Sequence, residues 1–262
     1  MKLEFYKCQG TGNDFVVLDN REGKYSDITS RQIHLLCNRR FGIGADGLML
    51  FNNKEGVDFE MKYFNSDGNE GSMCGNGGRC ILKFASMLGV KKAHYKFFAV
   101  DGLHEGEIDL DGIIKLKMQD VNDVVYSLNR YILNTGSPHY VKIITDITHE
   151  DVVKEGRLIR HSKEFAEEGI NVNFVEVLDE DQIYVRTYER GVEDETLSCG
   201  TGVTAAALIS AHNDKGFNRV EVKTAGGRLS VEFEKISDTQ FTNIWLSGPA
   251  EMVYSGEINL KD

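Results

Sequence analysis

Two Cys-Gly doublets of this chain, Cys74-Gly75 and Cys199-Gly200, stand 125 positions apart in matching surroundings. Each follows a polar, acidic loop and precedes a short apolar stretch that predicts a helix. A cysteine at a helix N-terminus meets unpaired backbone N–H groups and the positive end of the helix dipole, which favour its thiolate. Two such cysteines facing one another would form an acid/base pair of one thiol and one thiolate.

The elements that would position these cysteines are short. Apolar stretches at 80–85 and 203–209 predict the two helices, and a third helix is predicted over 30–38 with Ser30 as its N-cap. Strands are predicted at 15–18, 48–51, 59–64, 113–118, 140–144, 172–177, 183–188, 220–223 and 229–233. Because these strands come in hairpin-like clusters and do not alternate with long helices, we expect a mixed α+β fold and not a Rossmann sheet.

The doublets belong to a longer internal repeat. Three further pairs of segments match at nearly the same offset: 12–17 with 136–141, 44–48 with 169–173, and 98–102 with 222–227. Four landmarks in one order predict two copies of one domain. We expect each copy to be a β-rich structure wrapped around one central helix.

The composition of the chain argues against several classes of function. The chain has 262 residues, 41% of them hydrophobic, which is enough for two domains with buried cores. A net charge of −11 argues against nucleic acid or an anionic membrane surface as a partner. We find no signal peptide and no apolar run long enough to span a membrane, and the five cysteines lack a disulfide-scaffold spacing. We therefore expect a cytoplasmic protein that binds no membrane.

The chain contains two patterns that resemble a dinucleotide site and a metal site, but neither fits the requirements of such a site. Residues 42–47 match the G-x-G-x-x-G pattern of dinucleotide sites, but they precede a predicted strand, whereas that motif must open a helix. Cys74 and Cys80 are six residues apart, which is not a zinc spacing, so we expect no metal. Cys8, Cys37 and Cys80 are predicted to be inert buried thiols.

Polar residues near the repeat landmarks are candidates for binding a substrate. Glu189-Arg190 ends a predicted strand near the second cysteine, where the arginine offers a bidentate fork to a carboxylate. Asn13, Asn65 and Asn171 lie in turns rich in Gly and Asp, and their similar placement in the two copies favours ligand contacts over turn formation alone. His139 is either a packed histidine or a group that supports the site.

Six stretches of the chain together closely resemble the diaminopimelate epimerase family. They are Gly10-Thr11-Gly12-Asn13-Asp14-Phe15, Phe64-Asn65-Ser66-Asp67-Gly68, Cys74-Gly75-Asn76-Gly77-Gly78-Arg79-Cys80, Gly136-Ser137-Pro138-His139, Tyr188-Glu189-Arg190-Gly191 and Cys199-Gly200-Thr201-Gly202. The resemblance runs from about residue 3 to about residue 256. It implies an isomerase without a cofactor that interconverts LL- and meso-diaminopimelate, in the biosynthesis of lysine and of peptidoglycan precursors.

The resemblance also implies roles for individual residues. Cys74 and Cys199 would be the catalytic pair of a two-base reaction. The substrate's distal amino-acid end would be held by Asn13, Asn65, Asn171, Glu189 and Arg190. The reacting carboxylate would receive helix N-terminal N–H groups from Gly75, Asn76, Gly200 and Thr201.

The implied domains are pseudo-symmetric and comprise residues 1–117 with 251–262, and residues 118–250. A homodimer is left open. The chain departs from the family at Ser137, where asparagine is frequent, and at Gly47, where some members have glutamine. Both departures bear on substrate contacts, not on the cysteines, and Ser137 and His139 are kept as supporting residues.

Three other functions remain open. A related thiol-based racemase would act on proline or histidine, whereas the asparagines and Arg190 suit a second amino-acid group. A thiol–disulfide redox protein would cycle its cysteines against thioredoxin. An amino-acid-binding module without catalysis would not require a cysteine at both duplicated helix starts.

Overall fold

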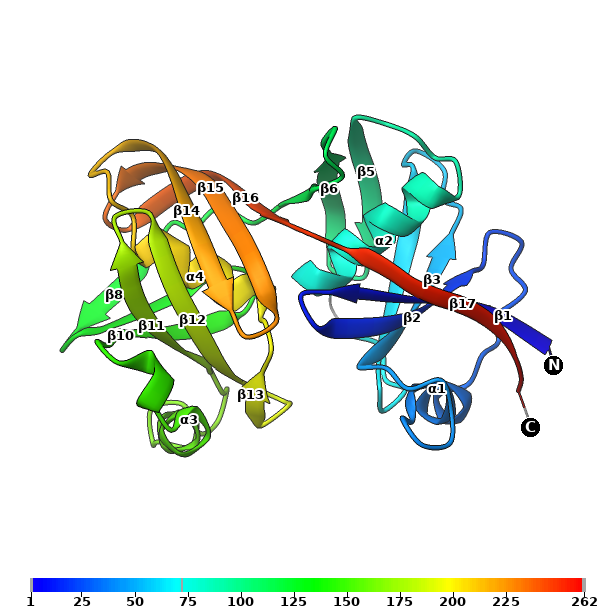
Figure 1. Cartoon of the computed structure of the whole chain (residues 1–262), viewed down its shortest axis with the longest axis horizontal. Coiled ribbons are helices and arrows are strands. Elements are labelled where there is room, and N and C mark those ends of the chain that lie inside the picture. Colours follow the sequence, from blue (N-terminus) through cyan, green and yellow to red (C-terminus); the bar gives the residue numbers. More distant parts are fainter. Residues whose placement is uncertain (1, 72, 261–262) are drawn as a thin grey trace. The chain divides into compact units, whose positions relative to one another are not determined.

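The computed structural model describes residues 2–71 and 73–260, and the chain divides into two compact units (Figure 1). Unit 1 consists of Met1–Leu116 with Pro249–Asp262, and unit 2 consists of Lys117–Gly248. These boundaries lie within two residues of those expected from the sequence. Within the described ranges, no helix has the length and apolar character needed to cross a membrane.

Unit 1 is one sheet with two helices. Its strands pair in the order β17-β1-β2-β3-β4-β5-β6-β7. Their bounds are β17 Glu251–Asn259, β1 Lys2–Gly10, β2 Asn13–Asp19, β3 Gly47–Asn52, β4 Phe59–Asn65, β5 His94–Ala99, β6 Gly102–Ile108 and β7 Ile114–Lys117. The β2–β3 and β4–β5 pairs are parallel and the others are antiparallel. Helix α1 (Ser30–Cys37) precedes β3, and helix α2 (Gly75–Met87) precedes β5.

Unit 2 repeats this plan. Its strands pair in the order β8-β9-β10-β11-β12-β14-β15-β16, again with two parallel pairs, β10–β11 and β12–β14. Their bounds are β8 Val124–Ser127, β9 Arg130–Asn134, β10 Pro138–Ile143, β11 Asn171–Asp179, β12 Gln182–Glu189, β14 Gly216–Thr224, β15 Gly227–Ser237 and β16 Gln240–Gly248. Helix α3 (Val152–Arg160) precedes β11 and helix α4 (Gly200–Ile209) precedes β14, while a 3₁₀ turn (Ile147–His149) and the short β13 (Asp194–Thr196) complete the unit.

The repeat landmarks fall on corresponding elements. The glycines before β2 and β10, Gly12 and Gly136, both have positive φ, at 87° and 108°. The glycines that open β6 and β15, Gly102 and Gly227, have φ of 124° and 147° in the matching hairpins. Because these values suit glycine and strain other residues, the turns explain why glycine recurs at the same offset. The predicted fold class, two pseudo-symmetric domains of mixed α+β type, is confirmed.

A central helix lies within each sheet. Helix α2 contacts β1, β2, β3, β6 and β17, and helix α4 contacts β9, β10, β11, β12, β14, β15 and β16 (Figure 1). Nearly all of α4 is buried, from Val203 to Leu208, as expected for a helix that is apolar on every side. Each sheet therefore curves around the helix that begins at one of the two Cys-Gly doublets.

Helix α1 corrects one prediction. Its N-cap is Thr29, not Ser30, because the Thr29 hydroxyl accepts from Gln32 N and the Gln32 side chain accepts from Thr29 N. This reciprocal capping box satisfies two N–H groups that the helix leaves open. Ile33, Leu36 and Cys37 are buried on one face, as predicted.

All nine predicted strand runs overlap strands of the structure, but several elements were missed, namely β1, β5, β6, β8, β9, β13, β16, β17 and α3. Strand β17 has no fully buried residue, and its half-buried positions, Met252, Gly256 and Ile258, give only a weak alternating pattern. Helix α3 contains Gly156, which lowers its helix propensity. That glycine is needed because a Cβ there would lie 2.4 Å from Tyr188 Cβ.

Candidate functional site

Each doublet cysteine is the N-cap of the central helix of its unit. Cys74 and Cys199 both have extended backbone, with φ/ψ of −96°/135° and −113°/111°. Their carbonyls accept the first helical hydrogen bonds, from Gly78 N at 2.7 Å and Val203 N at 2.8 Å. The N–H groups of the first helical turn have no carbonyl one turn back, so each cysteine lies beside an anion-binding helix terminus, as predicted.

Cys74 is half-buried, and its Sγ lies 3.5 Å from Asn13 Oδ1. The same oxygen accepts from Asn76 Nδ2 at 3.3 Å. Asn13 Nδ2 donates to Asp46 Oδ2 at 2.6 Å, which settles which end of the Asn13 amide faces the cysteine. The structure thus brings two predicted binding residues, Asn13 and Asn76, against Cys74, and adds Asp46, which sequence reasoning missed.

Asp46 belongs to an ionic network. Arg39 bridges Asp46 and Asp14, with Nη2 2.8 Å from Asp46 Oδ1 and 2.7 Å from Asp14 Oδ1. Lys7 Nζ lies 2.7 Å from Asp14 Oδ2. Burial raises the pKa of Asp14, but the hydrogen bonds and charges of Arg39 and Lys7 outweigh it and lower the pKa to about 2. These paired charges fix the loop that carries Asp46 to Asn13.

Cys199 is 8% exposed and has a different neighbour. Its Sγ lies 3.5 Å from the hydroxyl of Thr201, a residue predicted to bind the carboxylate. The Thr135 hydroxyl donates to Thr201 O at 2.8 Å and so ties the start of α4 to the end of β9. Thr135 was not predicted, because a threonine after a strand carries no distinctive signal.

A buried polar cluster supports the start of α4. Asn173 Oδ1 accepts from the Thr187 hydroxyl at 2.9 Å, and Asn173 Nδ2 lies 3.1 Å from His139 Nδ1. Because that amide nitrogen is a donor, Nδ1 of His139 is the acceptor and Nε2 carries the proton. Burial, with a smaller contribution from the charge of Arg190, lowers the pKa of His139 to about 3, so the ring is neutral at neutral pH. Asn173 was missed, because within β11 it reads as an interruption of an apolar strand.

Three predicted residues form one cluster at the edge of unit 2. Asn171 Nδ2 donates to Ser137 Oγ at 2.9 Å, and Asn171 Oδ1 accepts from Arg190 N at 2.9 Å. The exposed Arg190 side chain donates to Glu168 O at 2.9 Å. Glu189 is the half-buried last residue of β12. Arg190 therefore presents a guanidinium at the surface of this cluster.

Two predicted positions lie elsewhere in unit 1. Asn65 is the exposed last residue of β4. Gly47 opens β3, where an added Cβ would lie 2.5 Å from Tyr63 Cε2 and 2.6 Å from Phe64 O. A side chain at position 47 would thus collide with Tyr63, so the present arrangement of Tyr63 requires glycine there.

The remaining three cysteines are buried, as predicted. Burial raises the pKa of the Cys37 thiol to about 12 and that of the Cys80 thiol well above its ordinary value. Cys8 lies beside Cys80, with its Sγ 4.0 Å from Cys80 O. A thiol held neutral in this way is neither a base nor a nucleophile at neutral pH.

Arg79 belongs to the motif that begins at Cys74, but the sequence alone indicates no role for it. It lies five residues after Cys74 in α2, fully buried, and donates Nη2 to Asn76 Oδ1 at 2.9 Å and to the Thr11 hydroxyl at 3.2 Å. The signal that could have found it is a charged residue on a helix whose neighbouring positions are small or apolar.

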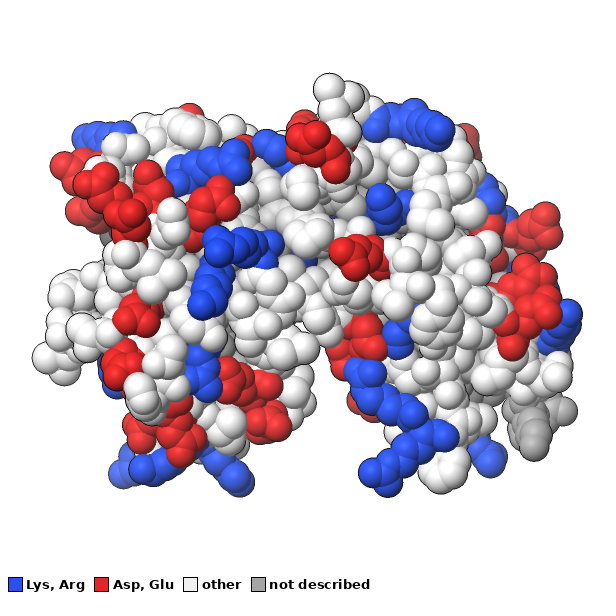
Figure 2. Space-filling view, viewed as in Figure 1, with Lys and Arg blue, Asp and Glu red and all other residues white. Residues whose placement is uncertain are grey.

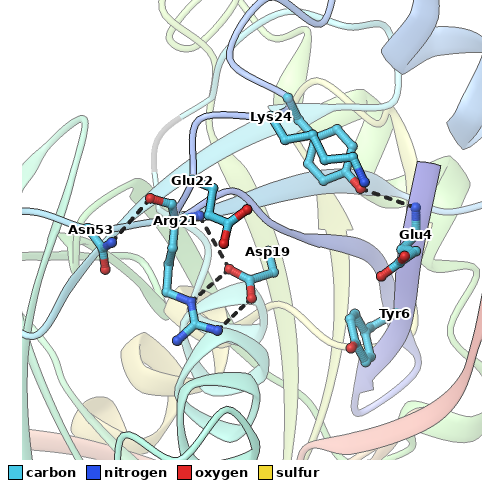
Figure 3. A pocket seen from close by; sticks show the side chains of 8 residues that line it. Glu4, Tyr6, Asp19, Arg21, Glu22, Lys24 and Asn53 are labelled. Atoms are coloured by element: carbon cyan, nitrogen blue, oxygen red, sulfur yellow. Dashed lines mark hydrogen bonds and ion pairs between the residues drawn. The ribbon is translucent and has the colours of Figure 1, made fainter. Parts of the chain in front are cut away.

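A separate hollow in unit 1 has charged walls, and no cysteine is among its lining residues (Figure 3). It measures about 510 Å³, and Arg21 there donates Nε and Nη2 to Asp19 at 2.8 and 2.6 Å. Asp19 is at the opposite end of β2 from Asn13, about 20 Å along the strand. In Figure 2, acidic and basic side chains are interspersed over the visible face of each unit. Within 2–71 and 73–260, no group of three His, Cys, Asp or Glu residues could hold a metal ion.

Comparisons with known proteins agree with this architecture. The family model described as diaminopimelate epimerase matches residues 5–124 and again 131–253. A diaminopimelate epimerase of Flavobacterium psychrophilum is 47% identical over 257 residues, which cover 98% of this chain and 100% of the relative. Another, of Chlorobaculum tepidum, is 44% identical over 261 residues, which cover 96% of this chain and 99% of the relative.

Solved structures with low sequence identity share the fold. A phenazine biosynthesis protein of the PhzF family from Bacillus anthracis superposes with a TM-score of 0.74 at 15% identity, covering 99% of both chains. A hydroxyproline epimerase from Agrobacterium vitis superposes with a TM-score of 0.69 at 12% identity, covering 100% of this chain and 93% of that one. At these identities the likeness concerns the fold alone.

Proposed function

Because this chain belongs to the diaminopimelate epimerase family, we propose that it interconverts LL- and meso-diaminopimelate, with Cys74 and Cys199 as its two acid/base groups. One observation carries the residue assignment. A cysteine is the N-cap of the central helix in each of two topologically equivalent units, with a glycine after it in both. A duplicated domain that keeps a cysteine at this one backbone position provides two thiol groups at matching helix starts.

The proposed reaction conserves protons at each step. One cysteine thiolate takes the proton from the Cα carbon, and the electron pair of that bond passes toward the carboxylate. The thiol of the other cysteine then gives its proton to the opposite face of the same carbon. The enzyme finishes with thiol and thiolate exchanged, so reversal of the reaction uses the same two groups in opposite roles.

The helix termini support the charge that develops on the substrate carboxylate. As the Cα proton leaves, negative charge moves onto the carboxylate oxygens, and N–H groups at the starts of α2 and α4 are suited to donate hydrogen bonds to these oxygens. We expect the donors to be the backbone N–H groups of Gly75, Asn76, Gly200 and Thr201. The Asn76 side chain is buried against Arg79 and Asn13, which favours its backbone N–H as the ligand group.

The cluster of Ser137, Asn171 and Arg190 supports diaminopimelate over a smaller amino acid. Diaminopimelate carries a second ammonium and carboxylate group, and an exposed guanidinium can bind that carboxylate in a bidentate manner. Asn13, Asn65 and Glu189 complete the proposed distal site. A proline or histidine racemase would have no such distal group to bind, so activity on proline or histidine in place of diaminopimelate would favour that alternative.

The direct test is turnover of LL-diaminopimelate in D₂O with reduced, purified protein. Two separate bases predict that meso product carries deuterium at the inverted Cα from the first turnover, while unreacted substrate keeps protium at low conversion. Chiral chromatography with mass spectrometry reads both isomers. Product that retains protium would refute the two-base assignment, and no turnover under reducing conditions would refute the function. A thioredoxin-coupled assay tests the alternative of a thiol–disulfide redox protein, whose cysteines would cycle against thioredoxin.

The proposal extends to the setting of the enzyme. The five cysteines lack a disulfide-scaffold spacing, and a working thiolate needs reducing conditions, which supports the cytoplasm as its compartment. Light scattering on the purified protein would test the homodimer that the family resemblance leaves open.

A further inference from the structure

The buried guanidinium of Arg79 lacks a carboxylate partner in the part of the chain that the structure describes. It is 0% exposed, and the groups that accept from it are all neutral. Beyond Asn76 Oδ1 and the Thr11 hydroxyl, they are Gly75 O and Pro249 O, each at 3.4 Å. Burying a charge is strongly unfavourable unless an opposite charge or strong hydrogen bonds compensate it.

Only two titratable groups in the described chain act on this charge, the thiols of Cys80 and Cys74. Burial lowers the pKa of Arg79, yet a guanidinium remains protonated in proteins. Cys80 is fully buried beside Cys8, and its pKa is raised well above the ordinary value, so it stays neutral. Cys74, half-buried at the helix start, is therefore the group suited to carry the negative charge.

Lys83 on α2 and Glu4 on β1 are further charges in this region, and most of the others have ion-pair or hydrogen-bond partners of their own. Lys7 on β1 pairs with Asp14 on β2. Asp46 pairs with Arg39 and is linked to Cys74 through Asn13. On β6 and β17 the remaining pairs are His104–Asp101, Glu105 with Lys96 and His94, Glu107–His94, Glu257–Lys2 and Glu251–Gln9. Strand β3 carries no charged residue.

Arg79 also orients the amide beside Cys74. Its Nη2 donates to Asn76 Oδ1, so the amide nitrogen of Asn76 is directed to Asn13 Oδ1. The Cys74 thiol shares that acceptor at 3.5 Å, and an S–H donor is a weak one. This contact favours the neutral thiol, whereas the helix terminus and the Arg79 cation both favour the thiolate.

The equivalent position of α4 is neutral. Five residues after Cys199 stands Thr204, also fully buried, whose hydroxyl donates to Gly200 O at 3.0 Å. The two helix starts therefore share their backbone but differ by one buried positive charge.

We propose that Arg79 is a positioning residue whose buried cation keeps Cys74 a thiolate in the resting protein, while Cys199 begins as the thiol. The catalytic consequence of this difference rests on the proposed function, whereas the protonation states of the two cysteines can be measured without it. In the resting state Cys74 is then the base, and a first turnover from this form begins at the face of the Cα carbon that Cys74 meets.

The first experiment needs only the wild-type protein. Iodoacetamide labelling over a series of pH values, with quantification of the two tryptic peptides by mass spectrometry, gives a midpoint for each cysteine. Cys74 is expected to have a midpoint at least one pH unit below that of Cys199. Equal midpoints, or a lower one for Cys199, would overturn the inference.

The second experiment uses a matched set of variants. Arg79→Met removes the charge and keeps the length, and it is expected to move the Cys74 midpoint up by about one pH unit or more. Arg79→Lys keeps the charge and is expected to restore most of that shift, and Thr204→Val is the control at the equivalent position. A folded Arg79→Met protein with reduced epimerisation but an unmoved Cys74 midpoint would assign Arg79 a purely structural role.

The two proposals can fail separately. If Arg79→Met does not fold, the wild-type midpoints and Arg79→Lys still decide the inference. If the wild-type protein does not turn over diaminopimelate but its Cys74 midpoint depends on the Arg79 charge, the proposed function fails and the inference stands.

Discussion

The start of α2 and the start of α4 share a backbone plan but have different surroundings. Both open with an extended cysteine followed by a buried glycine. Around Cys74 the structure places the Asn13 and Asn76 amides and a buried cation, whereas around Cys199 it places the Thr201 hydroxyl and, behind the helix, the neutral His139–Asn173 cluster.

The difference teaches which parts of a duplicated domain are interchangeable. The helix terminus and its N-cap depend only on backbone geometry, so both copies retain them. The supporting side chains set charge and polarity, and in these units they have diverged. If Cys74 and Cys199 serve one reaction, as proposed, the two cysteines differ in their surroundings before substrate binds.

We expect the largest effect from removing either of the two cysteine thiols. Cys74→Ala and Cys199→Ala should each lower epimerisation by about 10²–10⁴-fold, because the loss of a general acid/base is of that order. The double variant should be little worse than either single one, because both groups serve one reaction. Chiral chromatography of meso-diaminopimelate measures the rates. Cys37→Ala is the control, and substantial turnover by either single variant would contradict the assignment.

The free energy of unfolding of unit 2 should fall in acid because of His139. Its folded-state pKa of about 3 lies below the ordinary 6.5, so the unfolded chain binds the proton first as pH falls. Stability is therefore full above 6.5 and falls between about 6.5 and 3, at up to about 1.4 kcal/mol per pH unit. Trp245, the single tryptophan of the chain, lies on β16 of unit 2 and reports its unfolding in urea.

His139→Gln, which cannot take up that proton, should be less stable at neutral pH but should depend less on pH in this window. A slope equal to that of the wild type would show that other groups set the acid sensitivity of unit 2.

Equivalent glycines should respond unequally to alanine. A Cβ at Gly202 would lie 2.3 Å from Asn173 Oδ1, whereas a Cβ at Gly77 would meet the flexible ends of Met61 and Met49 at 3.3 and 3.5 Å. Gly202→Ala should cost about 1–3 kcal/mol by displacing a buried hydrogen-bonded amide. Gly77→Ala should change stability by less than about 1 kcal/mol. Urea unfolding compares them, and equal losses would mean that Asn173 moves aside without penalty.

The smallest expected effect concerns the distal site. Arg190→Lys should raise KM for diaminopimelate by about tenfold, because an ammonium cannot replace a bidentate guanidinium. Arg219→Lys, at an exposed ion pair on β14, is the matched control. Steady-state kinetics provide the readout, and an unchanged KM would place recognition of the distal carboxylate at another residue.

Much of the fold was predictable because the chain repeats itself. The Cys-Gly doublets and the glycines near 12, 136, 102 and 227 lie where the backbone requires them, at an N-cap or at positive φ. Such requirements are local, so residue type and spacing disclose them. Strand β17 could not be predicted in this way, because its inner face is only half-buried and the strand is held by backbone pairing with β1.

The sequence by itself determined the two helix starts, the duplicated plan and the candidate residues of the distal cluster. Only the tertiary structure decided which side chains surround each cysteine. It brought Asp46 to Asn13 across 33 positions, Thr11 to Arg79 across 68, and His139 to Asn173 across 34. These contacts depend on which strands pair and on which residues a curved sheet encloses, so residue spacing along the chain cannot reveal them.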